Sequence, residues 1–266
     1  MTLLLIYLTI CCLMVFSETW LLYPAPSDKY GDWDRSDLDH EEVWFTAGDG
    51  TRLYGWFLPH PEPKMAILYC HGNGENVARA ANYLGELRDA MSASVFVFDY
   101  RGYGRSEGKP FETGIVEDGM AAQRWLAVRM GIKPKDVVIW GRSLGGGVAV
   151  AVAARQDARA LVLENTFCSA VDVAAGRYRL FPVRWLMRNR YDSLDCIGDY
   201  NGPVFQSHGT LDTIVPIQYG RRLFDAIPSA QKRFLELPDI GHNHSRPANY
   251  YSEVAAFLDD VFAGQN

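Results

Sequence analysis

Short apolar runs alternate with amphipathic segments along most of the chain. A hairpin-like stretch begins at Glu42, EVWFTAGDGTRLYGWFL, and six apolar runs follow it: AILYC, SVFVFD, VVIW, ALVLE, VFQSH and RFLEL. Helical segments are predicted over residues 78–91, 114–130, 144–154, 219–227 and 250–262. Strands that are apolar throughout predict a mostly parallel eight-stranded sheet with helices on both faces and an N-terminal antiparallel hairpin. In such a sheet, ligands bind at the carboxyl ends of the strands.

The first residues depart from this alternation. Residues 3–16, LLLIYLTICCLMVF, carry no charge, and only Glu18 interrupts the apolar run before Leu22. This length suffices to cross a bilayer, so we predict a single-pass membrane anchor over residues 1–22. A cleaved signal peptide is the main alternative and a buried helix the second, but no basic residue precedes the run and no small-x-small cleavage site follows it. The sequence does not indicate on which side of the membrane the domain lies.

Two further segments lack periodicity. Residues 23–41 are rich in Pro, Asp and Gly and are interpreted as a linker that lies over the surface of one domain, residues 42–266. Residues 167–200 are too long for an ordinary connection and predict a short cap insertion over the strand ends. The insertion carries five arginines beside aromatic residues, a composition that fits either a solvated helix face or contact with an acyl chain or anionic group near a bilayer.

Composition removes several classes of function. The chain has 266 residues, of which 48% are hydrophobic and 22% charged, as in a compact globular domain. A net charge of −6 lacks the basic surface that nucleic-acid binding requires. Five cysteines without a CxxC pair or a zinc-like Cys/His spacing predict neither a disulfide framework nor a metal site, and no cofactor is expected.

A single serine stands among four glycines in VVIWGRSLGGG, between a strand and a helix. Gly141 and Gly145 flank Ser143 in the pattern G-x-S-x-G, which in this context predicts a nucleophile elbow. The free N–H of Leu144 at the helix start is then a candidate oxyanion donor. A phosphate-binding loop is disfavoured, because neither G-x-x-x-x-G-K-[ST] nor G-x-G-x-x-G is present. Arg142 fits either a solvent-facing position or contact with an anionic substrate group.

A serine nucleophile requires a base and an acid that orients the base, in the chain order Ser, Asp/Glu, His. Asp212 follows the strand VFQSH, and His242 follows the next strand, RFLEL. We therefore expect Asp212 to be the acid and His242 the base. Glu164 is an alternative acid, while His244 and His208 are alternative bases, with a structural hydrogen bond expected of His208.

The loops after the first two parallel strands supply the remaining candidates. The loop HGNGEN brings the backbone close to a substrate, so the N–H of Asn73 is expected to be the second oxyanion donor. His71 is expected to brace this loop. Asp99 and Arg101 in DYRGYGRSEG are expected to order a long loop at the rim of the site.

Taken in order, HGNGEN, DYRGYGRSEG, GRSLGGG, LENTF, HGTLDTIVP and GH make the chain resemble an α/β-hydrolase over residues 43–262. It is similar to small, N-terminally anchored members related to protein depalmitoylases and to serine-aminopeptidase-like proteins. The resemblance implies Ser143 as nucleophile, Asp212 as acid, His242 as base, and Asn73 with Leu144 as oxyanion donors, without a cofactor. The resemblance does not identify the substrate, and in particular it does not imply depalmitoylation.

These patterns predict a membrane-anchored serine hydrolase that cleaves an ester or thioester in a small acyl-containing substrate, such as a lipid or another acylated molecule. A serine peptidase or amidase is the alternative within enzymes. A hydrolase-fold scaffold that binds partners at the membrane without turnover is the alternative outside them.

Overall fold

The computed structural model describes residues 1–264, and its centre is an eight-stranded sheet in the order β1-β2-β4-β3-β5-β6-β7-β8. Strands β1 (Glu41–Thr46) and β2 (Arg52–Leu58) form an antiparallel hairpin around the GDG turn, and β2 also pairs antiparallel with β4. The other strands are parallel: β3 (Met65–Cys70), β4 (Ala93–Phe98), β5 (Val138–Arg142), β6 (Ala160–Glu164), β7 (Val204–Gly209) and β8 (Lys232–Leu237). The predicted sheet is thereby confirmed.

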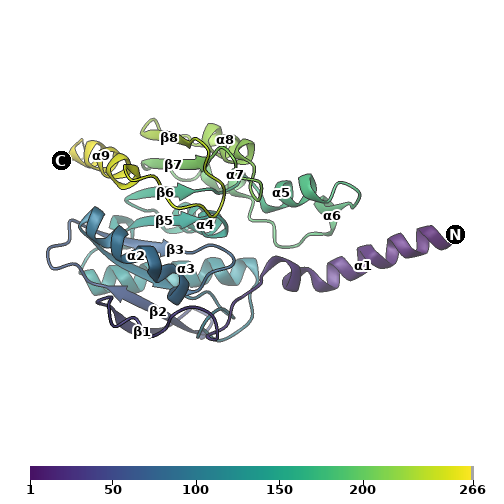
Figure 1. Cartoon of the computed structure of the whole chain (residues 1–266), viewed down its shortest axis with the longest axis horizontal. Coiled ribbons are helices and arrows are strands. Elements are labelled where there is room, and N and C mark those ends of the chain that lie inside the picture. Colours follow the sequence, from purple (N-terminus) through teal and green to yellow (C-terminus); the bar gives the residue numbers. More distant parts are fainter. Residues whose placement is uncertain (265–266) are drawn as a thin grey trace.

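Helices cover both faces of this sheet, as predicted (Figure 1). On one face lie α2 (Val77–Met91) and α9 (Tyr250–Ala263), and on the other lie α3 (Glu112–Met130), α4 (Leu144–Gln156) and α8 (Ile217–Ala226). Alternate residues of one strand enter opposite cores, so Ile67 and Tyr69 pack toward α2 and α9, while Leu68 and Cys70 pack toward α3 and α4. Burial on both faces is why the central strands are apolar at every position.

Residues 23–41 lie against the surface of the domain. The side-chain amide of Asn76 donates to the carbonyl groups of Ser27 and Tyr30, at 3.2 and 2.8 Å. Trp33 meets the buried ring of Trp56 edge-on, with ring centroids 5.9 Å apart. Contacts at Ser27, Tyr30 and Trp33 therefore hold this segment against the domain.

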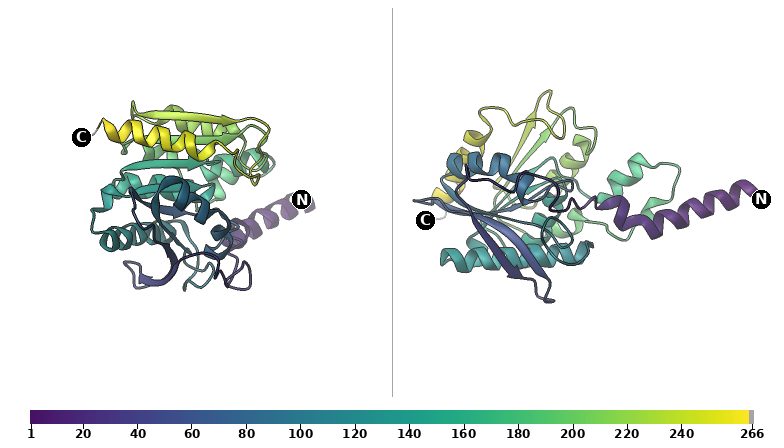
Figure 2. Two further views of the ribbon diagram at one scale, coloured as in Figure 1. Left: turned by 60° about the vertical axis from the view of Figure 1, so that its left-hand side comes forward. Right: turned by 60° about the horizontal axis from the view of Figure 1, so that its bottom comes forward.

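The N-terminal helix α1 (Thr2–Leu22) extends from the domain beside the insertion, which contains α5 (Ala170–Arg177), α6 (Val183–Leu186) and α7 (Ser193–Ile197) (Figures 1 and 2). By length and composition α1 can cross a membrane, a test that a signal sequence near the N-terminus also passes. Helix α7 returns against α4, whereas α5 and α6 lie out beside α1.

Candidate active site

Ser143 lies at the sharp turn between β5 and α4. Its backbone angles, φ 53° and ψ −118°, are strained for a residue with a side chain. The turn depends on close backbone approach, because a Cβ on Gly141 would lie 2.4 Å from the carbonyl oxygen of Gly145, and a Cβ on Gly145 would lie 2.0 Å from that of Cys70. The Thr166 hydroxyl also donates to the Ser143 carbonyl group at 2.8 Å. The serine side chain is thus held at the carboxyl edge of the sheet.

The structure brings Ser143, His242 and Asp212 together in one hydrogen-bonded chain. Ser143 Oγ lies 3.0 Å from His242 Nε2, and His242 Nδ1 lies 2.6 Å from Asp212 Oδ2. Both distances are within the reach that acid–base catalysis requires. With the imidazole neutral and its proton on Nδ1, the Nε2 lone pair faces the serine hydroxyl.

Asp212 is held as a carboxylate by several donors. Burial acts to raise its pKa, but hydrogen bonds from His208, His242 and the backbone N–H of Val215, with the nearby His242 charge, outweigh burial and lower the pKa. Its Oδ1 accepts the N–H groups of Ile214 and Val215 at 2.9 and 2.8 Å. The group that faces the histidine is therefore an anion fixed in direction.

The alternative acid and bases have other partners. Glu164 accepts hydrogen bonds from Arg246, Trp140 and Tyr250 within the domain. His244 Nδ1 accepts the Gly241 N–H at 3.1 Å, inside the loop that carries His242. His208 Nε2 lies 2.7 Å from the Val215 carbonyl oxygen and 3.5 Å from Asp212 Oδ2.

The two candidate oxyanion donors come from different elements that meet at the serine. Leu144 is the first residue of α4, where backbone N–H groups lack helical partners. Asn73 lies in the loop after β3 and lines the same cavity as Ser143. Its side chain is fixed on both ends, because the amide nitrogen donates to the Leu22 carbonyl oxygen at 2.5 Å and Oδ1 accepts from Tyr103 at 2.7 Å.

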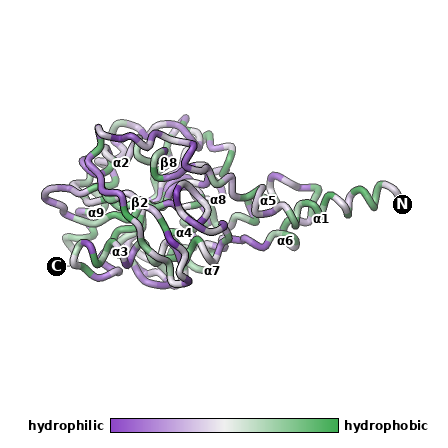
Figure 3. The backbone as a smooth tube through the Cα atoms, turned by 90° about the horizontal axis from the view of Figure 1, so that it is seen from below, coloured by the Kyte–Doolittle hydropathy of each residue, from purple (hydrophilic) through white to green (hydrophobic). Residues whose placement is uncertain are grey.

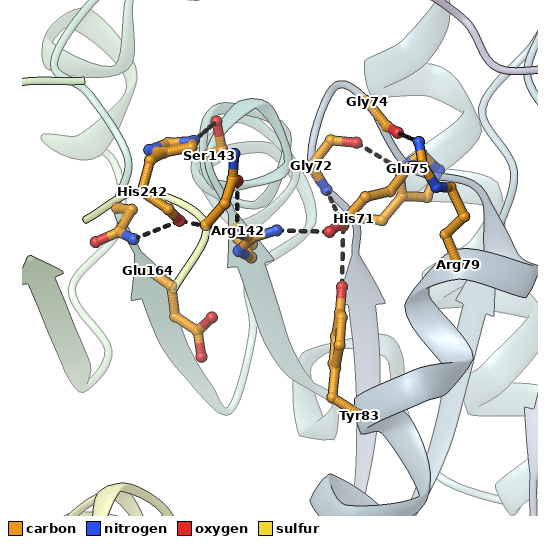
Figure 4. A network of polar contacts seen from close by, with 12 residues as sticks. His71, Gly72, Gly74, Glu75, Arg79, Tyr83, Arg142, Ser143, Glu164 and His242 are labelled. Atoms are coloured by element: carbon orange, nitrogen blue, oxygen red, sulfur yellow. Dashed lines mark hydrogen bonds and ion pairs between the residues drawn. The ribbon is translucent and has the colours of Figure 1, made fainter. Parts of the chain in front are cut away.

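Arg142 and Glu75 join the loop that carries Asn73 to the loop that carries His242, a contact that sequence reasoning missed (Figure 4). Arg142 Nη1 lies 2.5 Å from Glu75 Oε1, and Nη2 donates to the His242 carbonyl oxygen at 2.9 Å. Glu75 Oε2 accepts the Gly72 N–H at 3.0 Å and the Tyr83 hydroxyl at 2.9 Å. The Arg142 side chain is 14% exposed, so it faces an internal partner and not solvent.

His71, Asp99 and Arg101 are buried and hold the loops around the site in place. His71 is fully buried, its Nδ1 lies 2.8 Å from the Gly72 carbonyl oxygen, and burial lowers its pKa. Asp99 and Arg101 do not pair with each other. Asp99 accepts the N–H groups of Val77 and Arg105, and Arg101 pairs with Asp118 at 2.7 Å. Burial raises the pKa of Asp99 to about 7.

The serine opens into a cavity of about 910 Å³ lined by Ser143, His242, Asn73 and several charged side chains. Within residues 1–264, none of the residues that line this cavity belongs to the insertion at 167–200. The insertion, expected over the strand ends, contacts α1 through α6, while Asp172 of α5 pairs with Arg222 of α8.

The strand order, the sharp turn at Ser143 and the position of the loop that carries His242 together define the class of protein. This chain belongs to the α/β-hydrolase family. A family model described as "serine aminopeptidase, S33" matches residues 61–195. The chain is 38% identical over 205 residues to an uncharacterized protein of Mycobacterium tuberculosis, covering 76% of this chain and 72% of that protein. It is also 32% identical over 227 residues to an α/β-hydrolase domain-containing protein of Arabidopsis thaliana, with 78% and 74% covered.

Solved structures agree on the fold. An esterase of Pyrococcus furiosus superposes with a TM-score of 0.72 at 20% identity, over 90% of this chain and 97% of that one. An acetyl xylan esterase from a Paenibacillus species superposes with a TM-score of 0.69 at 14% identity, over 87% of each chain. The resemblance and the fold predicted from sequence are thus confirmed.

Proposed function

We propose that the chain is a membrane-anchored serine hydrolase that cleaves an ester or thioester through an acyl-enzyme. The observation that carries the proposal is the continuous chain from Ser143 Oγ to His242 and Asp212, with links of 3.0 and 2.6 Å. A serine hydroxyl becomes nucleophilic when a base accepts its proton, and this geometry supplies the base and its orienting acid.

In the proposed reaction, His242 Nε2 takes the Ser143 proton as Oγ bonds to the substrate carbonyl carbon. The oxygen of that carbonyl becomes negative and accepts hydrogen bonds from the backbone N–H groups of Asn73 and Leu144. The tetrahedral intermediate collapses, the bond to the leaving oxygen or sulfur breaks, and His242 donates its proton to that atom. Asp212 stabilises the imidazolium. Water then attacks the acyl-enzyme, with His242 as base, and releases the acid and free Ser143.

The substrate class is proposed as an acyl ester or thioester. An amide substrate is the alternative, because the matching family model carries the name serine aminopeptidase, whereas the two superposed structures named above are esterases. Comparison of acyl esters of graded chain length with aminoacyl amides decides between them. Faster turnover of the amides would replace the esterase assignment with a peptidase.

Anchoring is proposed through α1. Its outward side chains are strongly exposed, among them Leu3, Phe16 and Leu21, at 83, 87 and 67%. A helix with such a surface is stable in a lipid environment.

A fluorophosphonate probe on the full chain tests the nucleophile. We expect covalent labelling of the native chain and none of Ser143→Ala, because the probe reacts only with an activated serine. Ser106→Ala is the matched control and should label normally, since the Ser106 hydroxyl donates to the Asp99 carbonyl oxygen within a loop. An unlabelled native chain would instead favour a scaffold without turnover.

A further inference from the structure

Helix α1 and the cap insertion are joined by a buried carboxylate. Glu18, the one charged residue of α1, accepts the backbone N–H groups of Arg188 and Asn189 at 2.8 and 2.7 Å, and their side chains at 3.1 and 2.9 Å. A carboxylate with four donors is satisfied by protein and not by water. The insertion therefore compensates, through the Arg188 guanidinium and the other donors, the negative charge that would oppose burial of α1 in lipid.

A second contact joins α1 and the insertion nearer the N-terminus of the helix. The ring of Tyr7 stacks on Phe181 with centroids 5.8 Å apart, and the Tyr7 hydroxyl donates to the Leu180 carbonyl oxygen at 3.0 Å. From Tyr7 to Glu18 a helix rises roughly 16 Å, about half the thickness of a hydrocarbon core. The insertion thus accompanies α1 over a length comparable to one leaflet, and α1 cannot enter the bilayer to that depth without carrying the insertion with it.

The outer surface of the insertion has the composition of a membrane interface. Leu180 and Trp185 are 83 and 90% exposed, and Tyr178 is 47% exposed. Of the five arginines between residues 173 and 191, Arg184, Arg188 and Arg190 pair with Asp172, Glu18 and Asp192. Within residues 1–264 the ion pairs do not include Arg177 or Arg179, which flank Tyr178 on the exposed surface. Exposed Trp and Leu beside arginine favour the boundary between acyl chains and anionic headgroups.

Figure 3 shows the two elements side by side, with α5 and α6 next to α1 and beyond the body of the domain. We propose that residues 178–187 of the insertion enter the same leaflet as α1, so that both elements form one docking surface for a bilayer with anionic headgroups. This inference rests on the proposed anchoring by α1.

The docking surface also has a direct connection to the active site. The carbonyl group of Leu22, the last residue of α1, accepts the side-chain amide of Asn73 at 2.5 Å. Tyr23 continues this connection, because its hydroxyl lies 3.0 Å from Asn189 Oδ1 and 2.9 Å from the Tyr191 hydroxyl. Docking by two rigidly joined elements therefore fixes the orientation of the carboxyl edge of the sheet, where Ser143 lies, relative to the membrane.

The test uses the full chain in vesicles, with an environment-sensitive fluorescent amino acid in place of one residue at a time. The positions are Leu180 and Trp185 in the insertion, Leu13 in α1, and Val128 as control. Val128 is 83% exposed near the C-terminal end of α3, at the opposite edge of the sheet. The vesicles contain phosphatidylcholine and phosphatidylglycerol, with and without nitroxide groups on the acyl chains.

We expect blue-shifted emission and strong nitroxide quenching at positions 180 and 185, comparable with Leu13 and several-fold greater than at Val128. Aqueous emission at 180 and 185, with Leu13 in lipid, would overturn this inference and leave the anchor intact. Aqueous emission at Leu13 as well would overturn the proposed anchoring. Blue-shifted emission at 180 without nitroxide quenching would place protein, such as a second copy, on this surface and would also overturn the inference.

The anionic component has its own test. Arg177 and Arg179 are both exposed in the insertion. We expect Arg177→Gln/Arg179→Gln to reduce quenching at position 180 in phosphatidylglycerol vesicles, and a matched control, Arg124→Gln/Arg155→Gln, to leave it unchanged. Equal quenching in both double variants would overturn the assignment of an anionic surface.

Discussion

Arg142 is the last residue of β5, directly before Ser143, and its guanidinium group holds two loops at a fixed separation. One side meets Glu75, whose other oxygen accepts the Gly72 N–H, and the other side meets the carbonyl oxygen of His242. The planar fork of an arginine suits such a bridge better than a flexible ammonium group. The residue that the sequence left between solvent and substrate is thus a candidate positioning residue, and Figure 4 shows it between the two loops.

We expect Arg142→Gln to lower kcat by roughly ten- to a hundred-fold with a smaller change in KM, since displacement of a catalytic group by about 1 Å costs about that much. The rate of fluorophosphonate labelling should fall in parallel, because that reaction needs only the serine, its base and the oxyanion donors. Arg79→Gln is the control, as Arg79 lines the same cavity but donates to the Gly74 carbonyl oxygen. Normal labelling of Arg142→Gln combined with a raised KM would show substrate binding instead of positioning.

Also at the residue scale, the buried Asp99 gives a prediction of how the free energy of unfolding depends on pH. Burial raises its pKa to about 7 in the folded chain, from about 3.9 in an unfolded one. Between these values the folded state binds the proton more strongly, so the contribution of Asp99 to the free energy of unfolding decreases as pH rises from about 4 to about 7. Below this window the carboxyl is protonated in both states.

The comparison is with Asp99→Asn, which cannot ionise. We expect the unfolding midpoint of the native chain, measured relative to that variant in the same detergent, to fall between about pH 5 and about pH 7.5. A relative midpoint that rises with pH would mean that the backbone N–H groups of Val77 and Arg105 stabilise the anion more than burial opposes it.

At the scale of elements, the glycines around Ser143 differ in how closely neighbouring atoms approach them. A Cβ on Gly145 would lie 2.0 Å from the backbone carbonyl oxygen of Cys70, whereas a Cβ on Gly147 would lie 3.3 Å from the Phe167 ring. Backbone of β3 cannot yield, but a ring edge can shift slightly.

We therefore expect Gly145→Ala to move the start of α4 away from β3, with loss of fluorophosphonate labelling and a markedly lower unfolding midpoint. Gly147→Ala should stay within about 1 kcal/mol of the native chain, because alanine favours the helix by about that amount and offsets the tighter contact. Similar stability and labelling of the two variants would show that close packing of α4 on β3 is not what shapes the elbow.

The sequence predicted the elements that depend on local pattern. Strands buried on both faces, the GDG hairpin and the G-x-S-x-G turn all have signatures within a few residues, and each is present. Contacts between distant residues have no such signature. Glu75 and Arg142 lie 67 residues apart, and nothing in HGNGEN or GRSLG indicates that they pair. The contact between the insertion and α1 has no local signature for the same reason, since Glu18 lies 170 residues before Arg188.

At the scale of the whole molecule, Glu18 decides whether the insertion and α1 move as one body. Its side chain is 8% exposed and accepts hydrogen bonds from Arg188 and Asn189. Other contacts between the insertion and α1 include Tyr7 with Phe181, and Arg188 Nη2 with the Val15 carbonyl oxygen. Removal of the carboxylate leaves two buried backbone N–H groups without their acceptor, at a cost of about 1–3 kcal/mol each. We expect Glu18→Ala to release the insertion from α1 while the sheet stays folded.

Trypsin measures this release, because the insertion contains five arginines at which it can cut. Cleavage between residues 177 and 190 should become several-fold faster in Glu18→Ala than in the native chain, since proteolysis follows the population of the locally opened state. Trp20→Ala is the matched control on the same helix, as Trp20 is 89% exposed. Identical cleavage in Glu18→Ala and the native chain would mean that the remaining contacts, such as Tyr7 with Phe181 and Arg188 with the Val15 carbonyl oxygen, suffice to hold the insertion against α1, and that Glu18 is not what joins the two elements.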